Sequence, residues 1–100
     1  STLATFKANQ QSNILMRIHG KNIQQFPMGS RIETSSGQLI GLMGQSNQSL
    51  LTHDIRDLKE PLKVVWGDQL KQSCSIPITE FGSIVKKKNS QLDILNVECH

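Results

Sequence analysis

The sequence predicts an all-β fold, a small antiparallel β-sandwich of about seven strands. Every apolar run is only a few residues long and is bounded by Gly, Ser, Asn or Pro, which is typical of short strands joined by tight turns. Within these runs apolar residues recur with a period of two, as they do when one face of a strand is buried. No stretch has the apolar periodicity that would predict a lasting helix.

The strands can be placed in order along the chain. Residues 14–19 form the first strong strand, because isoleucine and methionine occupy its alternate positions. Residues 29–43 are typical of a hairpin, since the Ser-Ser-Gly at 35–37 provides a tight turn. Residues 54–61 are a charged connection that holds at most one helical turn. Shorter strands are expected at residues 50–53, 62–66, 72–79, 83–85 and 92–99.

The chain of 100 residues has the length of one domain. Residues 1–13 are polar apart from Leu3 and Phe6 and are expected to be a linker or tail, whereas residues 14–100 form the β-sandwich domain. No apolar run approaches the roughly 18 residues that cross a bilayer, and no signal-peptide pattern opens the chain. Because the chain begins with Ser, we expect a mature protein or an excised domain.

The charge balance argues against a nucleic-acid partner, although the formal net charge is +3. A nucleic-acid surface clusters Lys and Arg beside aromatic side chains on which bases stack. The only cluster here is Lys86, Lys87 and Lys88, tyrosine is absent, and the few aromatic residues lie elsewhere. A solvated loop is therefore the better interpretation of the three lysines.

Cys74 and Cys99 are the only cysteines and lie 25 positions apart, at or near expected strands. The favoured interpretation is a structural disulfide, which would stabilise the fold by about 3 kcal/mol through loop-closure entropy and implies an oxidising compartment. The alternatives are two buried thiols, or redox or metal chemistry. A zinc site would need more ligands at close spacing, and Cys99 with His100 does not supply them.

No set of residues predicts catalysis. The histidines His19, His53 and His100 are isolated in sequence, and no serine lies on a turn of the kind that carries a catalytic nucleophile. The glycine spacing fits neither a dinucleotide-binding nor a phosphate-binding loop, and strand glycines such as Gly41 more often mark bulges or close approach of another chain segment. The carboxylates are scattered, so we expect no enzyme activity, no cofactor and no metal ion.

Several apolar residues stand out of phase with their strands. If Ile40 and Leu42 face the core, their neighbours Leu39 and Met43 face outward, and the same reasoning applies to three other positions. Burial on both faces beneath a covering loop would explain these residues. The alternative is an exposed apolar patch, which usually marks a partner surface. On that alternative the candidate binding residues are Leu15, Leu39, Met43, Leu50 and Val65.

Short motifs follow one another through the chain in a definite order. They are Pro27-Met28-Gly29-Ser30, Gly37, Ile40-Gly41-Leu42-Met43-Gly44, Leu50-Leu51, Leu62-Lys63-Val64-Val65-Trp66-Gly67, Cys74 and Cys99. Over roughly residues 14–99 this series resembles the C-terminal domain of outer-membrane fimbrial ushers of the chaperone–usher pathway. The chain also resembles the ushers that assemble capsule-like surface fibres. Departures from the family pattern are Met28 for Phe, Ser30 for Ala, Asn47 for a turn Gly and Leu50 for an aromatic residue.

The resemblance implies a β-sandwich whose two cysteines form a disulfide, located on the periplasmic face of the outer membrane as part of a larger usher with a membrane β-barrel. It implies a non-catalytic role, in which the domain binds periplasmic chaperone–subunit complexes and passes them to the secretion pore. The expected partners are these complexes and the rest of the usher, with no small-molecule substrate. An alternative of another class is a structural, subunit-like β-domain that is itself polymerised or adhesive.

Overall fold

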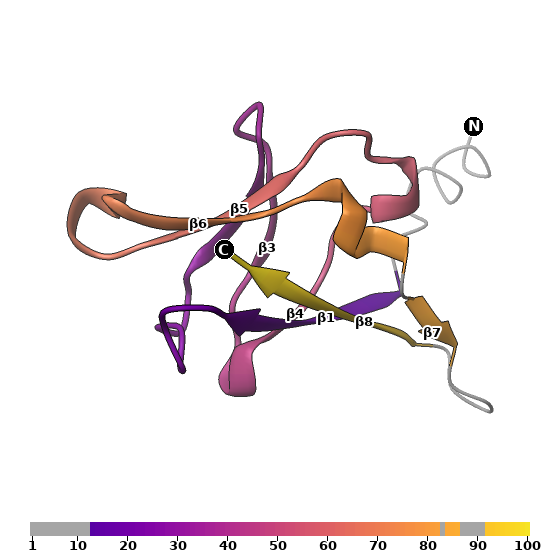
Figure 1. Cartoon of the computed structure of the whole chain (residues 1–100), viewed down its shortest axis with the longest axis horizontal. Coiled ribbons are helices and arrows are strands. Elements are labelled where there is room, and N and C mark those ends of the chain that lie inside the picture. The colour runs from indigo at the N-terminus through magenta and orange to yellow at the C-terminus, as the bar shows by residue number, and fades with distance from the viewer. Residues whose placement is uncertain (1–12, 83, 87–91) are drawn as a thin grey trace, which may run out of the picture.

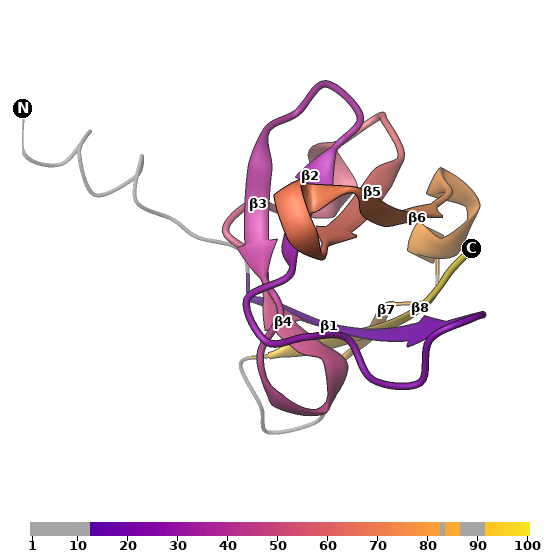
Figure 2. The ribbon, with the colours of Figure 1, turned by 90° about the vertical axis from the view of Figure 1, so that its left-hand side faces the viewer.

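A computed structural model of the chain describes residues 13–82, 84–86 and 92–100, which form a two-layered β-sandwich (Figures 1 and 2). The all-β fold expected from the sequence is thereby confirmed. The strands in the described residues are β1 (Ile14–Gly20), β2 (Arg31–Thr34), β3 (Leu39–Leu42), β4 (Gln48–Leu50), β5 (Leu62–Trp66), β6 (Gln72–Ile76), β7 (Ile84–Lys86) and β8 (Asp93–Cys99). Short 3-10 turns connect them: η1 (Gln45–Asn47), η2 (Ile55–Asp57), η3 (Asp68–Leu70) and η4 (Ile78–Gly82).

Each layer is a four-stranded sheet. The first sheet has the order β4-β1-β8-β7 and the second has the order β3-β2-β5-β6, and Figure 2 shows the second above the first. Among the strands of the described residues, only β1 and β8 pair in parallel, from Ile14 opposite Asp93 to Gly20 opposite Cys99, and the other pairs are antiparallel. The sequence predicted only antiparallel pairing. A parallel pair needs a long crossover connection, and here the whole second sheet lies in the chain between β1 and β8.

The core lies between the two sheets and is built from alternate strand positions. The apolar residues of β1 that were expected to share one face do point inward, and Leu95 and Val97 of β8 do the same. Phe26 belongs to this core, and the partly buried Trp66 packs edge-on against it with ring centroids 5.3 Å apart. Each fully buried aliphatic side chain contributes about 1.5–3 kcal/mol. The largest fully buried side chains are Phe26, Ile14, Met16, Ile18, Ile32, Ile40, Leu51, Ile55, Leu62, Ile76, Leu95 and Val64.

One corner of the sandwich is closed directly after β4. The Leu51 amide donates to the Ile14 carbonyl at 3.1 Å, and the next amide, that of Thr52, donates to the Ile40 carbonyl at 2.9 Å. Consecutive residues thus bond to strands of different sheets. This is why the strand ends at Leu50, where the sequence predicted that it would begin.

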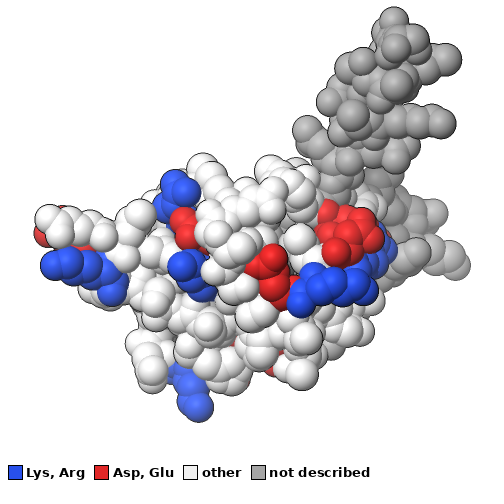
Figure 3. All heavy atoms as spheres, turned by 90° about the horizontal axis from the view of Figure 1, so that it is seen from above, with Lys and Arg blue, Asp and Glu red and all other residues white. Residues whose placement is uncertain are grey.

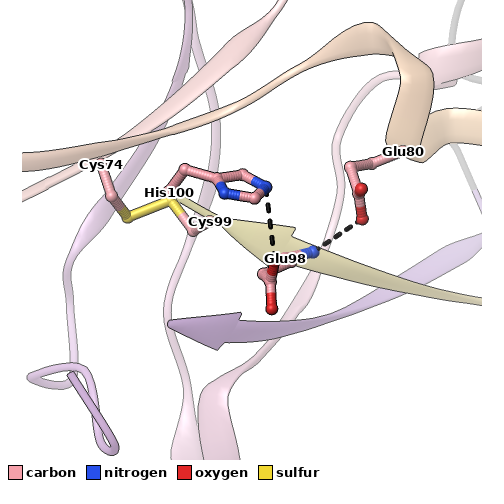
Figure 4. Close-up of a disulfide and its surroundings, with 5 residues drawn as sticks. All are labelled: Cys74, Glu80, Glu98, Cys99 and His100. Atoms are coloured by element: carbon pink, nitrogen blue, oxygen red, sulfur yellow. Dashed lines mark hydrogen bonds and ion pairs between the residues drawn. A yellow bond between two sulfur atoms is a disulfide. The ribbon is translucent and has the colours of Figure 1, made fainter. Parts of the chain in front are cut away.

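The opposite corner is closed by the end of β8. Beyond that strand, His100 exchanges two backbone hydrogen bonds with Ser75 of β6, at 2.8 and 2.9 Å. The disulfide between Cys74 and Cys99, with Cα atoms 5.5 Å apart, lies beside this exchange (Figure 4). The structural disulfide expected from the sequence is confirmed, and it links the second sheet covalently to the first.

The edge of β8 beyond its pairing with β7 is covered by a side chain. The Glu98 amide donates to a carboxylate oxygen of Glu80 at 2.9 Å, and the Glu98 carboxylate lies 3.4 Å from the His100 imidazole (Figure 4). Unpaired strand amides invite pairing with another chain. The Glu80 carboxylate therefore satisfies a group that would otherwise be exposed.

Asn47 stands where the resembled pattern has a turn glycine, and its side-chain hydrogen bonds account for the difference. Its φ of 56° lies in the left-handed region, which glycine favours and asparagine tolerates. Its side chain accepts a hydrogen bond from the Phe26 amide at 2.9 Å and donates one to the Gln24 carbonyl at 3.0 Å. A glycine would keep the backbone conformation but would lose both bonds.

Some sequence predictions fall outside the described residues. These are the linker, except for Asn13, and the lysines Lys87 and Lys88; Lys86 belongs to β7 rather than to a loop. The boundary between linker and domain remains a prediction. In the described part of the chain, no helix is long and apolar enough to cross a membrane.

We predict that replacing both Cys74 and Cys99 by Ser lowers the free energy of unfolding by about 3 kcal/mol, because the unfolded chain regains the entropy of a 25-residue loop. Equilibrium denaturation by urea measures this change. The matched control is wild type under reducing conditions, which should lose a similar amount. Equal stability of the oxidised wild type and the double variant would contradict the prediction.

We also predict that Gly41→Ala is destabilising by about 1–3 kcal/mol through overpacking. A Cβ atom at Gly41 would lie 2.6 Å from the Ser49 Oγ and 3.3 Å from a Leu51 methyl group, where β3 passes close to β4. Gly82→Ala is the control, since a Cβ atom there meets nothing within 4 Å. Denaturation midpoints that fall equally for both variants would show that close packing at Gly41 is not the cause.

Candidate protein-binding surface

The outer face of the second sheet carries exposed leucines next to paired charges. The strand register places two rows of side chains across this face. The first row is Leu42, Arg31, Val65 and Ser73, and the second is Leu39, Glu33, Lys63 and Ser75. Because β3 is an edge strand of this sheet, its two leucines stand at the margin of the face.

A bulge in β3 decides which of its residues are exposed. Gly41 pairs with Ile32 and Leu39 pairs with Glu33, so Ile40 is the extra residue and the alternation is broken there. As a result Leu42 is 54% exposed, although strict alternation placed it in the core. Met43 is only 2% exposed. The prediction that Met43 belongs to an exposed patch was therefore wrong, whereas Leu39 is exposed as predicted.

Val65 points to the outer face, as its strand phase predicted, but its side chain is covered. It is 7% exposed, so its expected exposure was wrong. Arg31 stands beside it in the cross-strand row. On the other side Val65 forms part of a small hollow of about 130 Å³ that is also lined by Met28 and Leu70. These longer side chains and the loops that carry them shield the valine.

The other two predicted residues lie on the opposite side of the molecule, on the outer face of the first sheet. Leu15 and Leu50 are cross-strand partners, and Ile94 of β8 flanks Leu15 in the same row. Leu50 is 54% exposed and Leu15 is half-buried. The structure therefore divides the five candidates between two outer faces and the core, and whether any of them binds a partner remains a prediction.

Sequence reasoning missed other exposed apolar side chains. Met28 occupies the second position of a turn in which Ser30 donates to the Pro27 carbonyl at 3.1 Å and Gly29 has a φ of 85°. This Pro-Met-Gly-Ser turn was readable from the sequence, and its second residue points outward. Leu70 could not be found in this way, because nothing in the local sequence predicts its positive φ of 54°. The exposed large apolar residues in the described part of the chain are Met28, Leu39, Leu42, Leu50, Leu70, Ile78 and Leu92.

Charges on the second sheet's outer face are arranged around Glu33. Its carboxylate accepts a bond from the Arg31 Nε at 2.6 Å and lies 3.9 Å from the Lys63 Nζ. Pairs this open to solvent add only about 0–1 kcal/mol to stability. Figure 3 shows the charged side chains as small separate groups on a mostly uncharged surface. The face thus suits protein contacts that combine apolar burial with a few charge pairs.

The turn beside Leu39 is held by a carboxylate. Glu60 accepts bonds from the Ser35 hydroxyl and the Ser36 amide, both at 2.8 Å, and these bonds lower the pKa of Glu60 below its ordinary value. In the neighbouring connection, a side-chain hydrogen bond from Arg56 lowers the pKa of Asp54. Both carboxyl groups are therefore ionised at neutral pH, and both serve local structure. Among the described residues, no three His, Cys, Asp or Glu side chains gather so that they could hold a metal ion.

Comparisons with known proteins identify the fold and the family. The chain matches the family model of the PapC C-terminal domain over residues 15–80. One similar solved structure is described as "Crystal structure of the C-terminal domain of the PapC usher"; it is 16% identical with a TM-score of 0.59, and the match covers 86% of this chain and 95% of that chain. Another is described as "Conserved hydrophobic clusters on the surface of the Caf1A usher C-terminal domain are important for F1 antigen assembly".

The Caf1A structure is 22% identical with a TM-score of 0.56, over 86% of this chain and 93% of that chain. At these identities the two structures establish likeness of fold. No curated protein sequence matches the chain. The family match, however, spans most of the described sandwich, from β1 to η4. The chain belongs to the PapC C-terminal domain family and is an usher C-terminal domain.

Proposed function

We propose that this chain acts on the periplasmic side of the outer membrane and binds chaperone–subunit complexes as surface fibres are secreted and assembled. The role is non-catalytic: the domain supplies a docking surface, and it needs no cofactor. Membership in the usher C-terminal domain family supports the pathway. The partners that follow are the chaperone–subunit complexes and the rest of the usher.

The observation that carries the proposal is the exposure of Leu39 and Leu42 on the edge strand β3. The outer face of an antiparallel sheet that meets only solvent is normally polar, and an exposed apolar edge strand promotes aggregation. Leucines at both outward positions of such a strand are best explained by a partner that covers them. For the Caf1A usher domain, surface hydrophobic clusters are described as important for F1 antigen assembly, which supports the same use here.

The outer face of the first sheet is the second part of the proposed surface. Its exposed residue is Leu50, with the half-buried Leu15 beside it. This cluster is smaller than the one on β3, so we assign it the weaker contact. Single substitutions can distinguish the contributions of the two faces to binding, because Leu42 and Leu50 are equally exposed and both can be replaced without opening the core.

We predict that the domain binds a purified chaperone–subunit complex in the micromolar range or tighter, and that Leu42→Asp or Leu39→Asp weakens binding at least about tenfold. A buried unpaired carboxylate in the interface is the physical reason. Isothermal titration calorimetry measures the affinity, with free chaperone as the comparison. Leu50→Asp should have a smaller effect.

Ser75→Asp is the matched control, since it adds the same charge at an exposed position on the same face but removes no leucine. Met43→Asp is not informative for binding, because its buried side chain supports the core. Folded Leu39→Asp and Leu42→Asp domains that bind the complex as tightly as wild type would show that β3 is not the docking surface. If the wild-type domain binds no complex at all, the proposed function itself is wrong.

A further inference from the structure

Arg17 is the only arginine without an ion pair in the described residues, which include every arginine of the sequence. The Arg31 Nε lies 2.6 Å from the Glu33 carboxylate, and an Nη of Arg56 lies 2.6 Å from that of Asp54. All 8 Asp and Glu residues of the sequence lie in the described part of the chain, and none of them pairs with Arg17. No acidic side chain of the sequence therefore balances this guanidinium.

The side chain of Arg17 also lacks hydrogen bonds. Its Nε is buried, yet it donates to no acceptor in the described residues. A buried donor without an acceptor is rare in folded proteins and costs stability. The two Nη groups are not buried in this way, since the residue as a whole is partly exposed. The surface thus carries a guanidinium whose polar groups do nothing for the part of the fold that the structure describes.

Arg17 lies in the middle of the outer face of the first sheet. It belongs to β1, an inner strand, and the register places Gln48 of β4 and Asn96 of β8 on either side of it. Neither neighbour carries a charge. Two positions earlier on the same face, about 7 Å along the strand, Leu15 pairs with the exposed Leu50. An apolar contact area and an unbalanced cation are therefore adjacent on one face.

We propose that Arg17 binds a carboxylate of the docked chaperone–subunit complex, next to the place where an apolar side chain of that complex covers Leu50. This inference rests on the proposed function and names the chemistry that the first sheet selects. Arginine suits such a contact because its guanidinium is weakly hydrated and can bond both oxygens of a carboxylate. An acidic group on the partner supplies the charge that the chain does not, whereas a basic group there would be repelled.

A role in packing would require less than an arginine. The methylene stem of an arginine can cover apolar neighbours while its charged head stays in water, and a methionine would cover them as well. If Arg17 served packing alone, Arg17→Met would leave the affinity for the complex unchanged. That substitution therefore separates recognition of a carboxylate from simple coverage of the sheet.

The test measures the affinity for a purified chaperone–subunit complex by isothermal titration calorimetry and the stability of the free domain by urea denaturation. We expect Arg17→Met to unfold at the same urea concentration as wild type or at a higher one, because it removes an unpaired buried donor. We expect it to bind the complex about fivefold more weakly, with a smaller difference at high salt. An Arg17→Met domain that binds as tightly as wild type would overturn the inference.

Two substitutions of nearly equal size isolate the charge. Any effect of shortening the side chain is common to Arg17→Gln and Arg17→Glu, and Arg17→Glu should bind at least about threefold more weakly because like charges repel. This comparison decides if Arg17→Met fails to fold. Lys71→Gln is the matched control, since it removes one positive charge at an exposed position between β5 and β6. Equal binding of Arg17→Gln and Arg17→Glu, or an equal loss in Lys71→Gln and Arg17→Met, would overturn the inference.

The failure of this inference can be told from the failure of the proposed function. A wild-type domain that binds the complex and is weakened by Leu42→Asp, but not by Arg17→Met, keeps the docking role and overturns only the role of Arg17. A wild-type domain that binds no complex overturns both. The two substitutions lie on the outer faces of different sheets, so neither disturbs the contact that the other one tests.

Discussion

The closure of the sandwich by β8 is the constraint on which the rest of the structure depends. This strand pairs along its whole length with β1, so the pair joins segments from opposite ends of the described chain. No hairpin holds such a parallel pair together, and the entropy of closing so long a loop opposes it. Immediately beyond β8, His100 pairs with β6, and the disulfide from Cys99 to Cys74 fixes that junction. The disulfide is thus placed where no short connection along the chain holds the paired strands together.

Most of the fold was predictable because its strands are buried on one face only. A period of two in residues such as Ile14, Met16 and Ile18 is a local signal, and it remains valid whatever the strands pair with. The pairing itself was less accessible. The residues of β1 and β8 do not predict that the two strands pair in parallel, because the direction of pairing follows from the path of the chain between them.

The candidate surface was harder to predict, because the exposure of a side chain, like strand pairing, depends on residues outside its own strand. Leu42 and Met43 exchange places because one extra residue, Ile40, is accommodated opposite β2, and a bulge depends on both strands. Val65 has the predicted direction but is covered by side chains from β2 and from two loops. The exposure of Leu39 and Leu50 was predicted correctly, because Leu39 precedes the bulge and the register of β4 with β1 has no shift. An alternation with a period of two therefore predicts the face of the sheet on which a side chain lies, whereas predicting its exposure also requires knowing which side chains surround it.

The arrangement of exposed groups bears on how such a domain can interact. Leu42 and Leu50 lie on the outer faces of two packed sheets, and packed sheets are about 10 Å apart. One small flat contact cannot cover both faces. Each face has few apolar groups, interrupted on the second sheet by the charges around Glu33. Such mixed surfaces are typical of contacts that form and dissociate, rather than of permanent interfaces.

The edges of the second sheet complete this picture. Natural sheets protect their edges from unwanted pairing, and here single residues do so: Thr52 bonds to β3 and His100 bonds to β6. Of these two edges, β3 also presents the exposed Leu39 and Leu42. A contact at β3 therefore draws on the burial of side chains rather than on backbone pairing.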